Sequence, residues 1–338
     1  DVSEGAARGA QQIWEQSPGN CCFNFQVGNA NAADEAITAA ATVIRLSSDN
    51  GRLVQNPLET RGYIGLWDAD AECYTLHAAA GKPQTVGRDL AQFVFGLPED
   101  SVRAVTKDVG GGFGAKNPLY PEQALVLWTA KKLDRPVSWQ SSRSETFLAD
   151  YQGRGQAADA EMALDKKGNV LALRINILAD LGAFLGPRGS TAPNMWRTMG
   201  ASVYDLPVVD YNVRAIHTHN MPTCPYRGAG APEAVFIIER LFDMAAAKLG
   251  LSAGDIRRKN LISAEAMPFK TAIGTTLDSG DFAQVMDSAE RMADLSGFDA
   301  RKAESAAQGR LRGLGYGNLL EACGAGIPDR AVISCLPD

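Results

Sequence analysis

The sequence predicts an α+β fold in which mixed sheets carry packed helices. Two signals carry this prediction. Residues 156–164 and 170–178 flank Asp165-Lys-Lys-Gly-Asn169, a turn-forming run typical of a β-hairpin. Further along the chain, an apolar stripe at helical spacing runs from Glu233 to Leu249 and ends at a glycine, which is where helices commonly stop.

The remaining elements follow from the same patterns, taken along the chain. Strands are expected at residues 23–27, 61–66, 73–78, 102–109, 137–140 and 208–219, and from 312 to the end. Helices are expected at residues 32–44, 83–95 and 121–133, and starting at Ser252 and at Ser279. The helix at 121–133 is apolar nearly all round its middle, which predicts a buried helix, and residues 181–200 are expected to form a loop past a site.

Composition limits the kind of protein this is. The chain has 338 residues, 45% of them hydrophobic and 21% charged, which is typical of a globular protein. A net charge of -6 argues against a basic nucleic-acid surface, and no apolar run reaches membrane-spanning length. The six cysteines lack iron–sulfur or disulfide-framework spacing, so a reducing cytoplasm is expected, with the periplasm as the alternative.

Asp108-Val-Gly-Gly-Gly-Phe-Gly-Ala-Lys-Asn117 is the most informative stretch. It lies between a predicted strand and a predicted helix, where unpaired N–H groups gather, so it is a candidate cradle for an anion. It also satisfies the dinucleotide pattern G-x-G-x-x-A, but no acidic residue follows at the required distance. The P-loop pattern fails because Asn117 stands where Ser or Thr should bind magnesium, and a plain packing turn remains an alternative.

His217-x-His219, with Cys224 nearby in sequence, is the only arrangement that suggests a metal. Zinc needs three or four such ligands, and the only other histidine is His77. Histidines on a strand face that bond to their neighbours are the favoured interpretation, so no metal ligand is assigned to this chain.

Two glycine-rich loops, taken together, resemble those of the molybdenum hydroxylases. The loops are residues 110–116 and Tyr226-Arg-Gly-Ala-Gly-Ala-Pro-Glu233. The family is that of xanthine dehydrogenase and aldehyde oxidase, which includes the aerobic carbon monoxide dehydrogenases. Four further stretches agree in order, at residues 53–61, 179–184, 256–262 and 277–282, the last being most like the carbon monoxide dehydrogenase-like large subunits.

The resemblance implies a first molybdopterin-binding domain, whose cofactor is molybdopterin, with the cytosine dinucleotide form as one version. Main-chain groups of both loops would face the cofactor, and the protein would orient a substrate against it. The cofactor-binding residues implied are Gly110, Gly111, Gly112, Phe113, Gly114, Arg227 and Gly228. The residues expected in the catalytic pocket are Arg227, Asn117, Ala229 and Met195.

Four positions depart from the family pattern and bear on the substrate. Gly81 stands where a glutamine near the metal is frequent, and Asn117 stands where xanthine-type enzymes carry a glutamate. Ala229 replaces a substrate-stacking aromatic residue, and Gly228 replaces the cysteine of carbon monoxide dehydrogenases. Purine recognition and copper–sulfur chemistry are therefore disfavoured, and hydroxylation of an aldehyde or an aromatic N-heterocycle is expected.

The resemblance also implies partners. The second cofactor-binding half, with its general-base glutamate, is not found in these residues, so the isolated chain is expected to be inactive as a truncated or split product. We expect residues 1–20 to be a linker, 21–300 the first molybdopterin-binding domain and 301–338 the beginning of the second half. Fe–S and FAD subunits and a chain carrying the second half are the expected partners. A dinucleotide-binding dehydrogenase and an inactive fragment or interaction module are the rival interpretations.

Overall fold

Two mixed β-sheets organise residues 1–321, the part of the chain that the computed structural model describes. The larger sheet has the strand order β1-β9-β8-β7-β2, in which β8 and β9 run parallel and the other neighbours antiparallel. Its strands are β1 (Cys21–Gly28), β2 (Thr42–Asn50), β7 (Gln156–Leu164), β8 (Val170–Gly182) and β9 (Val209–His217). Alternate residues of these strands are buried, so one apolar face of the sheet is available to pack against helices.

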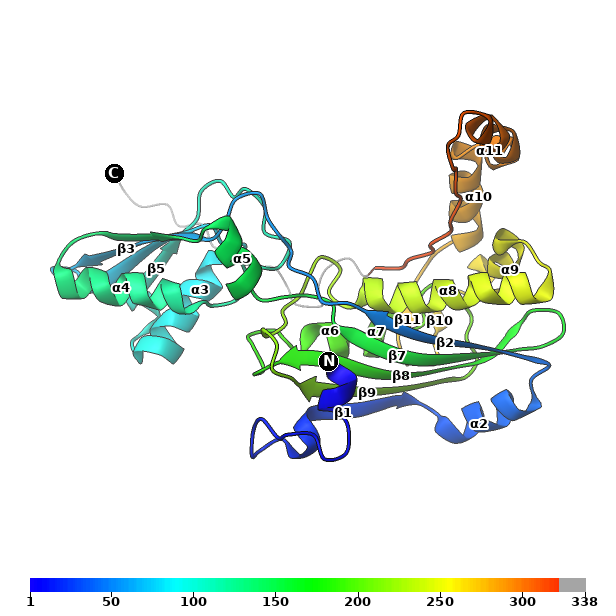
Figure 1. The fold of residues 1–338 in the computed structure, drawn as a ribbon, viewed down its shortest axis with the longest axis horizontal. Coiled ribbons are helices and arrows are strands. Elements are labelled where there is room, and N and C mark those ends of the chain that lie inside the picture. Colours follow the sequence, from blue (N-terminus) through cyan, green and yellow to red (C-terminus); the bar gives the residue numbers. More distant parts are fainter. Residues whose placement is uncertain (322–338) are drawn as a thin grey trace.

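The long helix α8 (Ala231–Leu249) covers that apolar face (Figure 1). Its buried stripe includes Ile238, Leu241 and Phe242, which join strand residues such as Ile175 and Val213 in one hydrophobic cluster. The other helices of this part are α1 (Val2–Gly5), α2 (Ala30–Ala39), α6 (Thr191–Asn194), α7 (Trp196–Met199), α9 (Ala253–Asn260), α10 (Phe282–Met292) and α11 (Phe298–Ala307). A two-stranded ribbon pairs β10 (Phe269–Lys270) with β11 (Thr276–Leu277).

The smaller sheet has the order β5-β4-β3-β6 and a separate hydrophobic cluster. Its strands are β3 (Gly62–Asp68), β4 (Cys73–Ala78), β5 (Val102–Val105) and β6 (Val137–Gln140). Its helices are α3 (Pro83–Asp89), which continues as a π-helix (Leu90–Phe95), α4 (Pro121–Leu133) and α5 (Arg143–Ala149). Helix α4 packs on β3 so closely that a Cβ at Gly65 would lie 2.6 Å from the Val126 backbone.

The smaller sheet belongs to an insertion in the larger unit. The chain leaves the larger sheet after β2 and returns at β7, and Asn50 pairs with Gln156 across those two strands. Leu53 and Gly153 extend this pairing with two backbone hydrogen bonds of 3.0 and 2.8 Å. We call residues 56–150 the small lobe and residues 1–55 with 151–321 the large lobe; the two lie side by side (Figure 1).

The α+β fold with mixed sheets and packed helices is confirmed. The hairpin strand at 156–164, the strand at 137–140 and the helix at 121–133 have the predicted bounds. Ser252 caps α9 by accepting the N–H of Asp255, and Asp281 caps α10 in the same way. Within residues 1–321, no helix combines the length and apolar character needed to cross a membrane.

Several element predictions are wrong in part. The helix expected at 32–44 ends at Ala39, and β2 follows, because Thr42 onward alternates and pairs with β7. The strand expected to reach residue 109 ends at Val105, where its parallel pairing with β4 stops. Residues 191–199 hold the short helices α6 and α7 instead of a loop. Residues 312–321 form no strand, and the rest of that predicted strand lies outside the described residues.

The prediction that helix α4 is buried holds only for the side that faces the sheet. Leu125 and Trp128 on its outer side are 56% and 51% exposed, while Val126 and Leu127 are buried against the sheet. A helix on one face of a small sheet has only one partner, so its outer side meets solvent even where the residues are apolar.

Candidate functional site

The first glycine-rich loop, residues 110–116, turns sharply after β5. Gly111 and Gly114 have φ of 99° and 109°, values that favour glycine. Phe113 lies between them with φ of 49°, which is uncommon for a bulky residue, and its side chain is 45% exposed. Strained residues of this kind concentrate at functional sites, so this geometry marks the loop as a candidate.

The second glycine-rich loop, residues 226–230, leads into α8. Gly228, Ala229 and Gly230 all have positive φ, of 89°, 46° and 106°. A Cβ at Gly230 would collide with the Ala192 carbonyl and the Met195 Cβ, so this position requires glycine. Met195 therefore packs directly against the second loop.

The two loops touch, although more than a hundred residues separate them. The Arg227 N–H donates a hydrogen bond of 3.0 Å to the Phe113 carbonyl. A Cβ at Gly114 would fall on the Pro225 carbonyl, so glycine is needed at 114 for the loops to meet. Residues of the small and large lobes thus form one continuous surface at this point.

Both loops present unpaired main-chain donors. Four consecutive N–H groups find no acceptor within residues 1–321: those of Gly111, Gly112, Phe113 and Gly114. In the same range, the N–H groups of Gly228 and Gly230 also have none. Successive free N–H groups in glycine-rich turns form binding sites for anions. The pair of loops is therefore suited to hold an anionic ligand by its main chain.

Asn117 lies just beyond the first loop, and its N–H donates to the Gly114 carbonyl at 3.2 Å. Its side-chain carbonyl oxygen occupies the space that a side chain at residue 81 would fill, so it lies directly against Gly81. Two of the four departures noted in the sequence are thus neighbours in space. Within the described part of the chain, the side-chain amide of Asn117 forms no hydrogen bond, so it is available to bind a ligand.

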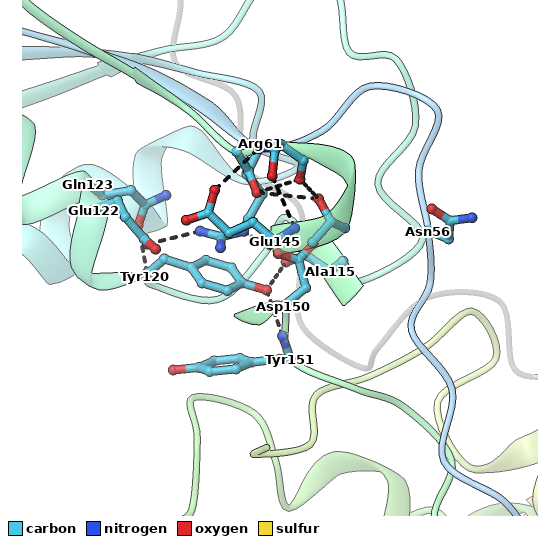
Figure 2. Close-up of polar contacts among 12 residues, drawn as sticks. Asn56, Arg61, Ala115, Tyr120, Glu122, Gln123, Glu145, Asp150 and Tyr151 are labelled. Carbon is cyan, nitrogen blue, oxygen red and sulfur yellow. Dashed lines mark hydrogen bonds and ion pairs between the residues drawn. The ribbon is translucent and has the colours of Figure 1, made fainter. Parts of the chain in front are cut away.

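A buried cluster behind the first loop anchors its end (Figure 2). The Tyr120 hydroxyl donates to the Ala115 carbonyl at 2.8 Å and accepts the Tyr151 N–H at 3.2 Å. The Arg61 guanidinium lies 3.7 Å above the Tyr120 ring and pairs with Asp150 at 2.6 Å. Burial raises the pKa of Tyr120 well above its ordinary value, so the hydroxyl remains a donor at all physiological pH values.

Arg154 holds the second loop in a comparable way. Its guanidinium donates to the carbonyls of Tyr226 and Arg227, at 3.3 and 3.0 Å, and pairs with the buried carboxylate of Glu233 at 3.2 Å. It also lies 4.5 Å from the centre of the Tyr226 ring. Sequence reasoning missed Arg154 and Tyr120 because their partners are distant in sequence and no local pattern marks them.

The histidines do not gather into a metal site. The Nδ1 of His217 lies 3.3 Å from the Gly182 carbonyl, and the residue is buried. Within residues 1–321 there is no group of three or more His, Cys, Asp or Glu side chains that could hold a metal ion. Burial raises the pKa of the Cys224 thiol to about 12, so this sulfur is a neutral packing group beside the Gly114 carbonyl.

Comparison with known proteins agrees with this arrangement. The family model described as "Molybdopterin cofactor-binding domain" matches residues 13–261. The carbon monoxide dehydrogenase large chain of Hydrogenophaga pseudoflava is 31% identical, covering 91% of this chain and 39% of that protein. The nicotine 6-hydroxylase large subunit of Paenarthrobacter nicotinovorans is 30% identical over 86% of this chain and 36% of its own length.

Among solved structures, quinoline 2-oxidoreductase from Pseudomonas putida 86 superposes with a TM-score of 0.82. It is 30% identical, and the match covers 90% of this chain and 39% of that one. The chain thus spans about two fifths of the length of the relatives it matches.

Proposed function

The chain belongs to the molybdopterin cofactor-binding domain family, and we propose that it supplies half of the cofactor site of a molybdenum hydroxylase. The contact between the two glycine-rich loops carries this proposal, because it gathers the unpaired N–H groups of residues 111–114, 228 and 230 at one place. A large anionic cofactor needs such a set of main-chain donors.

The residues present fit a molybdopterin, with the cytosine dinucleotide form included in the proposal. Gly110, Gly111, Gly112, Phe113 and Gly114 would hold it from one side, and Arg227 and Gly228 from the other. When bound, the cofactor would supply the two-electron oxidation chemistry. The main-chain N–H groups of the two loops would bind its anionic groups.

The substrate pocket would lie along the same loops. Phe113 is half exposed beside the free N–H groups and can exclude water from a bound substrate. Met195 packs against the second loop next to Ala229. The side-chain amide of Asn117, which has no hydrogen-bond partner within residues 1–321, can orient a polar group of the substrate. Arg227 is exposed at the loop contact and completes this set of proposed pocket residues.

An aldehyde or an aromatic N-heterocycle is the proposed substrate class, hydroxylated with oxygen from water. Two of the relatives are named for nicotine and quinoline, which are N-heterocycles. The geometry at residue 228 argues against copper–sulfur chemistry at that position. With φ of 89° and a Cβ only 2.6 Å from the Pro232 ring, the backbone there disfavours a cysteine.

The relatives' names, "large chain" and "large subunit", describe components of multi-subunit enzymes. For this chain we propose an Fe–S subunit and an FAD subunit as electron acceptors, and a chain or segment carrying the second cofactor-binding half. We propose that the protein is located in the cytoplasm. The boundaries at residues 20 and 300 remain predictions.

The first test is the molybdenum and pterin content of the protein purified from its native host with whatever binds it. We expect about one molybdenum and one pterin for each copy of this chain, as a single-site cofactor requires. A stoichiometric nicotinamide or flavin on this chain, or no cofactor at all, would overturn the proposal.

A matched pair of variants ties the cofactor to the loops. Gly114→Ala places a methyl group on the Pro225 carbonyl and should reduce molybdenum content several-fold by separating the loops. Gly274→Ala carries comparable positive-φ strain, with φ of 89°, but meets nothing within 4 Å. It should therefore keep the wild-type molybdenum content. Equal content in both variants would contradict the assigned site.

A further inference from the structure

Glu59 connects the two ends of the first glycine-rich loop. Its carboxylate accepts the Gly110 N–H at 2.8 Å and the Lys116 ammonium at 2.6 Å through the same oxygen, Oε2. Its own N–H donates to the Gly110 carbonyl at 3.0 Å. Gly110 and Lys116 bracket the four free N–H groups, so one side chain holds both ends of the segment that presents them.

Sterics at residue 110 support the same conclusion. A Cβ built on Gly110 would lie 2.5 Å from the Glu59 Cβ. Glycine is thus required at 110 for Glu59 to approach, independently of any ligand. This explains one glycine of the motif by a contact within the protein.

Glu59 is also the ion-pair partner of Lys116. The Lys116 side chain is only 2% exposed, while that of Glu59 is 39% exposed. A buried ammonium is costly unless it is paired, so losing the carboxylate would leave an uncompensated charge under the loop. Because the ammonium is directed at Glu59, it neutralises that carboxylate beneath the loop.

We propose that Glu59 is a positioning residue, which closes the loop at residues 110–116 and thereby sets the orientation of its free N–H groups. The proposal rests on the proposed function only for the identity of the ligand. The closed loop itself is a property of the chain and can be measured without a cofactor.

The test compares Glu59→Ala, Glu59→Gln and the double variant Glu59→Gln/Lys116→Met in the intact protein with its partners. Amide hydrogen exchange is followed by mass spectrometry in a peptide that covers residues 107–118, and molybdenum and pterin are counted per chain. In Glu59→Ala, we expect exchange at Gly110 to rise at least tenfold and cofactor content to fall several-fold.

The Gln variants separate the two contacts of the carboxylate. Glu59→Gln can still accept the Gly110 N–H but leaves Lys116 unpaired, so we expect a smaller exchange increase and reduced cofactor content. Adding Lys116→Met removes the buried charge at nearly the same side-chain volume and should restore cofactor content toward wild type. A purely general loss of stability would not show this rescue.

Glu161→Gln is the matched control. Glu161 lies on β7, pairs with Arg45 at 2.9 Å and is also partly exposed, but its partners are on the large sheet. In the Glu161→Gln variant, hydrogen exchange at Gly110 and the cofactor content should equal those of the wild type. Wild-type exchange and content in Glu59→Ala, or no rescue in the double variant, would overturn the role of Glu59. A wild-type protein without pterin would overturn the proposed function instead, and the exchange data would still decide the role of Glu59.

Discussion

At the scale of single residues, one oxygen atom links two segments that frame the site. The Tyr120 hydroxyl satisfies both the Ala115 carbonyl and the Tyr151 N–H in a buried position. Its ring stacks on that of Tyr151, with centroids 4.8 Å apart. Removing the oxygen alone keeps the ring packing but leaves the Ala115 carbonyl and the Tyr151 N–H buried without a hydrogen-bond partner.

Tyr120→Phe should therefore lower the free energy of unfolding by about 2 kcal/mol, the typical cost of buried groups left without a partner. Denaturant unfolding monitored by circular dichroism measures this change. Tyr74→Phe is the control, because Tyr74 is buried and stacked but its hydroxyl has no recorded hydrogen bond within residues 1–321. It should change the free energy by less than about 0.5 kcal/mol. Equal losses in both variants would contradict the linking role.

Because the Cys224 thiol is buried, we expect the free energy of unfolding to depend on pH in the alkaline range. Burial raises its pKa to about 12, against about 8.5 for a thiol in the unfolded chain. Above pH 8.5 the unfolded chain loses this proton and the folded chain keeps it, so the contribution is full below pH 8.5 and is lost as pH rises toward 12. Between pH 7 and pH 9.5, this group should remove about 1 kcal/mol from the free energy of unfolding.

Cys224→Ala removes the titrating group, so its free energy of unfolding should fall less between those two pH values than that of the wild type. Urea unfolding at pH 7 and pH 9.5 gives both differences. If the two proteins lose the same free energy, the thiol is not the group responsible.

At the scale of elements, sequence periodicity located most helices and strands but not their surroundings. Helix α4 has the predicted bounds because local signals mark both of its ends. Pro121 stands at its start, and the apolar run ends at Leu133. The exposure of Leu125 and Trp128 depends on how many elements pack around the helix, which no local pattern records. Strand β2 was missed because its alternation begins directly after an alanine-rich helix.

Gly65 tests the packing of α4 on β3. Gly65→Ala would place a methyl group within 2.6 Å of the Val126 backbone, and a backbone cannot move aside as a flexible side chain can. We expect a loss of about 1–3 kcal/mol in the free energy of unfolding, as for other overpacked sites.

Gly62→Ala is a suitable control on the same strand, because its Cβ would meet only the Gln140 side chain and the Trp139 carbonyl, both at 3.8 Å. Its melting temperature should stay close to that of the wild type. A loss at Gly62 as large as that at Gly65 would mean that the strand, and not the helix contact, is responsible.

At the scale of the whole molecule, the small lobe is an insertion whose two ends meet. Asn50 pairs with Gln156, and Leu53 pairs with Gly153, where the chain enters and leaves the large lobe. Each lobe has its own hydrophobic cluster. Insertions with adjacent ends are commonly removable without loss of the parent fold.

Replacing residues 56–150 by a short Gly-Ser connector should therefore leave a large lobe that still unfolds cooperatively. Trp196 reports on it, because this residue is fully buried in the cluster under α8 and stays in the shortened chain. We expect blue-shifted emission and a sigmoidal thermal transition at a lower midpoint than in the wild type. Red-shifted emission without a transition would show that the large lobe needs the insertion.

The sequence by itself determined the fold class, the hairpin of β7 and β8, the stripe of α8, the cap of α9 and the two glycine-rich loops. These are local features, since helix and strand periods, caps and turns depend on residues close together in the chain. Only the tertiary structure decided that the loops touch, that Asn117 lies against Gly81, and that Glu59 and Arg154 hold the loops in place. These contacts join residues tens to more than a hundred positions apart. The contact between Phe113 and Arg227 joins the two lobes, whereas those of Asn117, Glu59 and Arg154 depend on how each lobe folds.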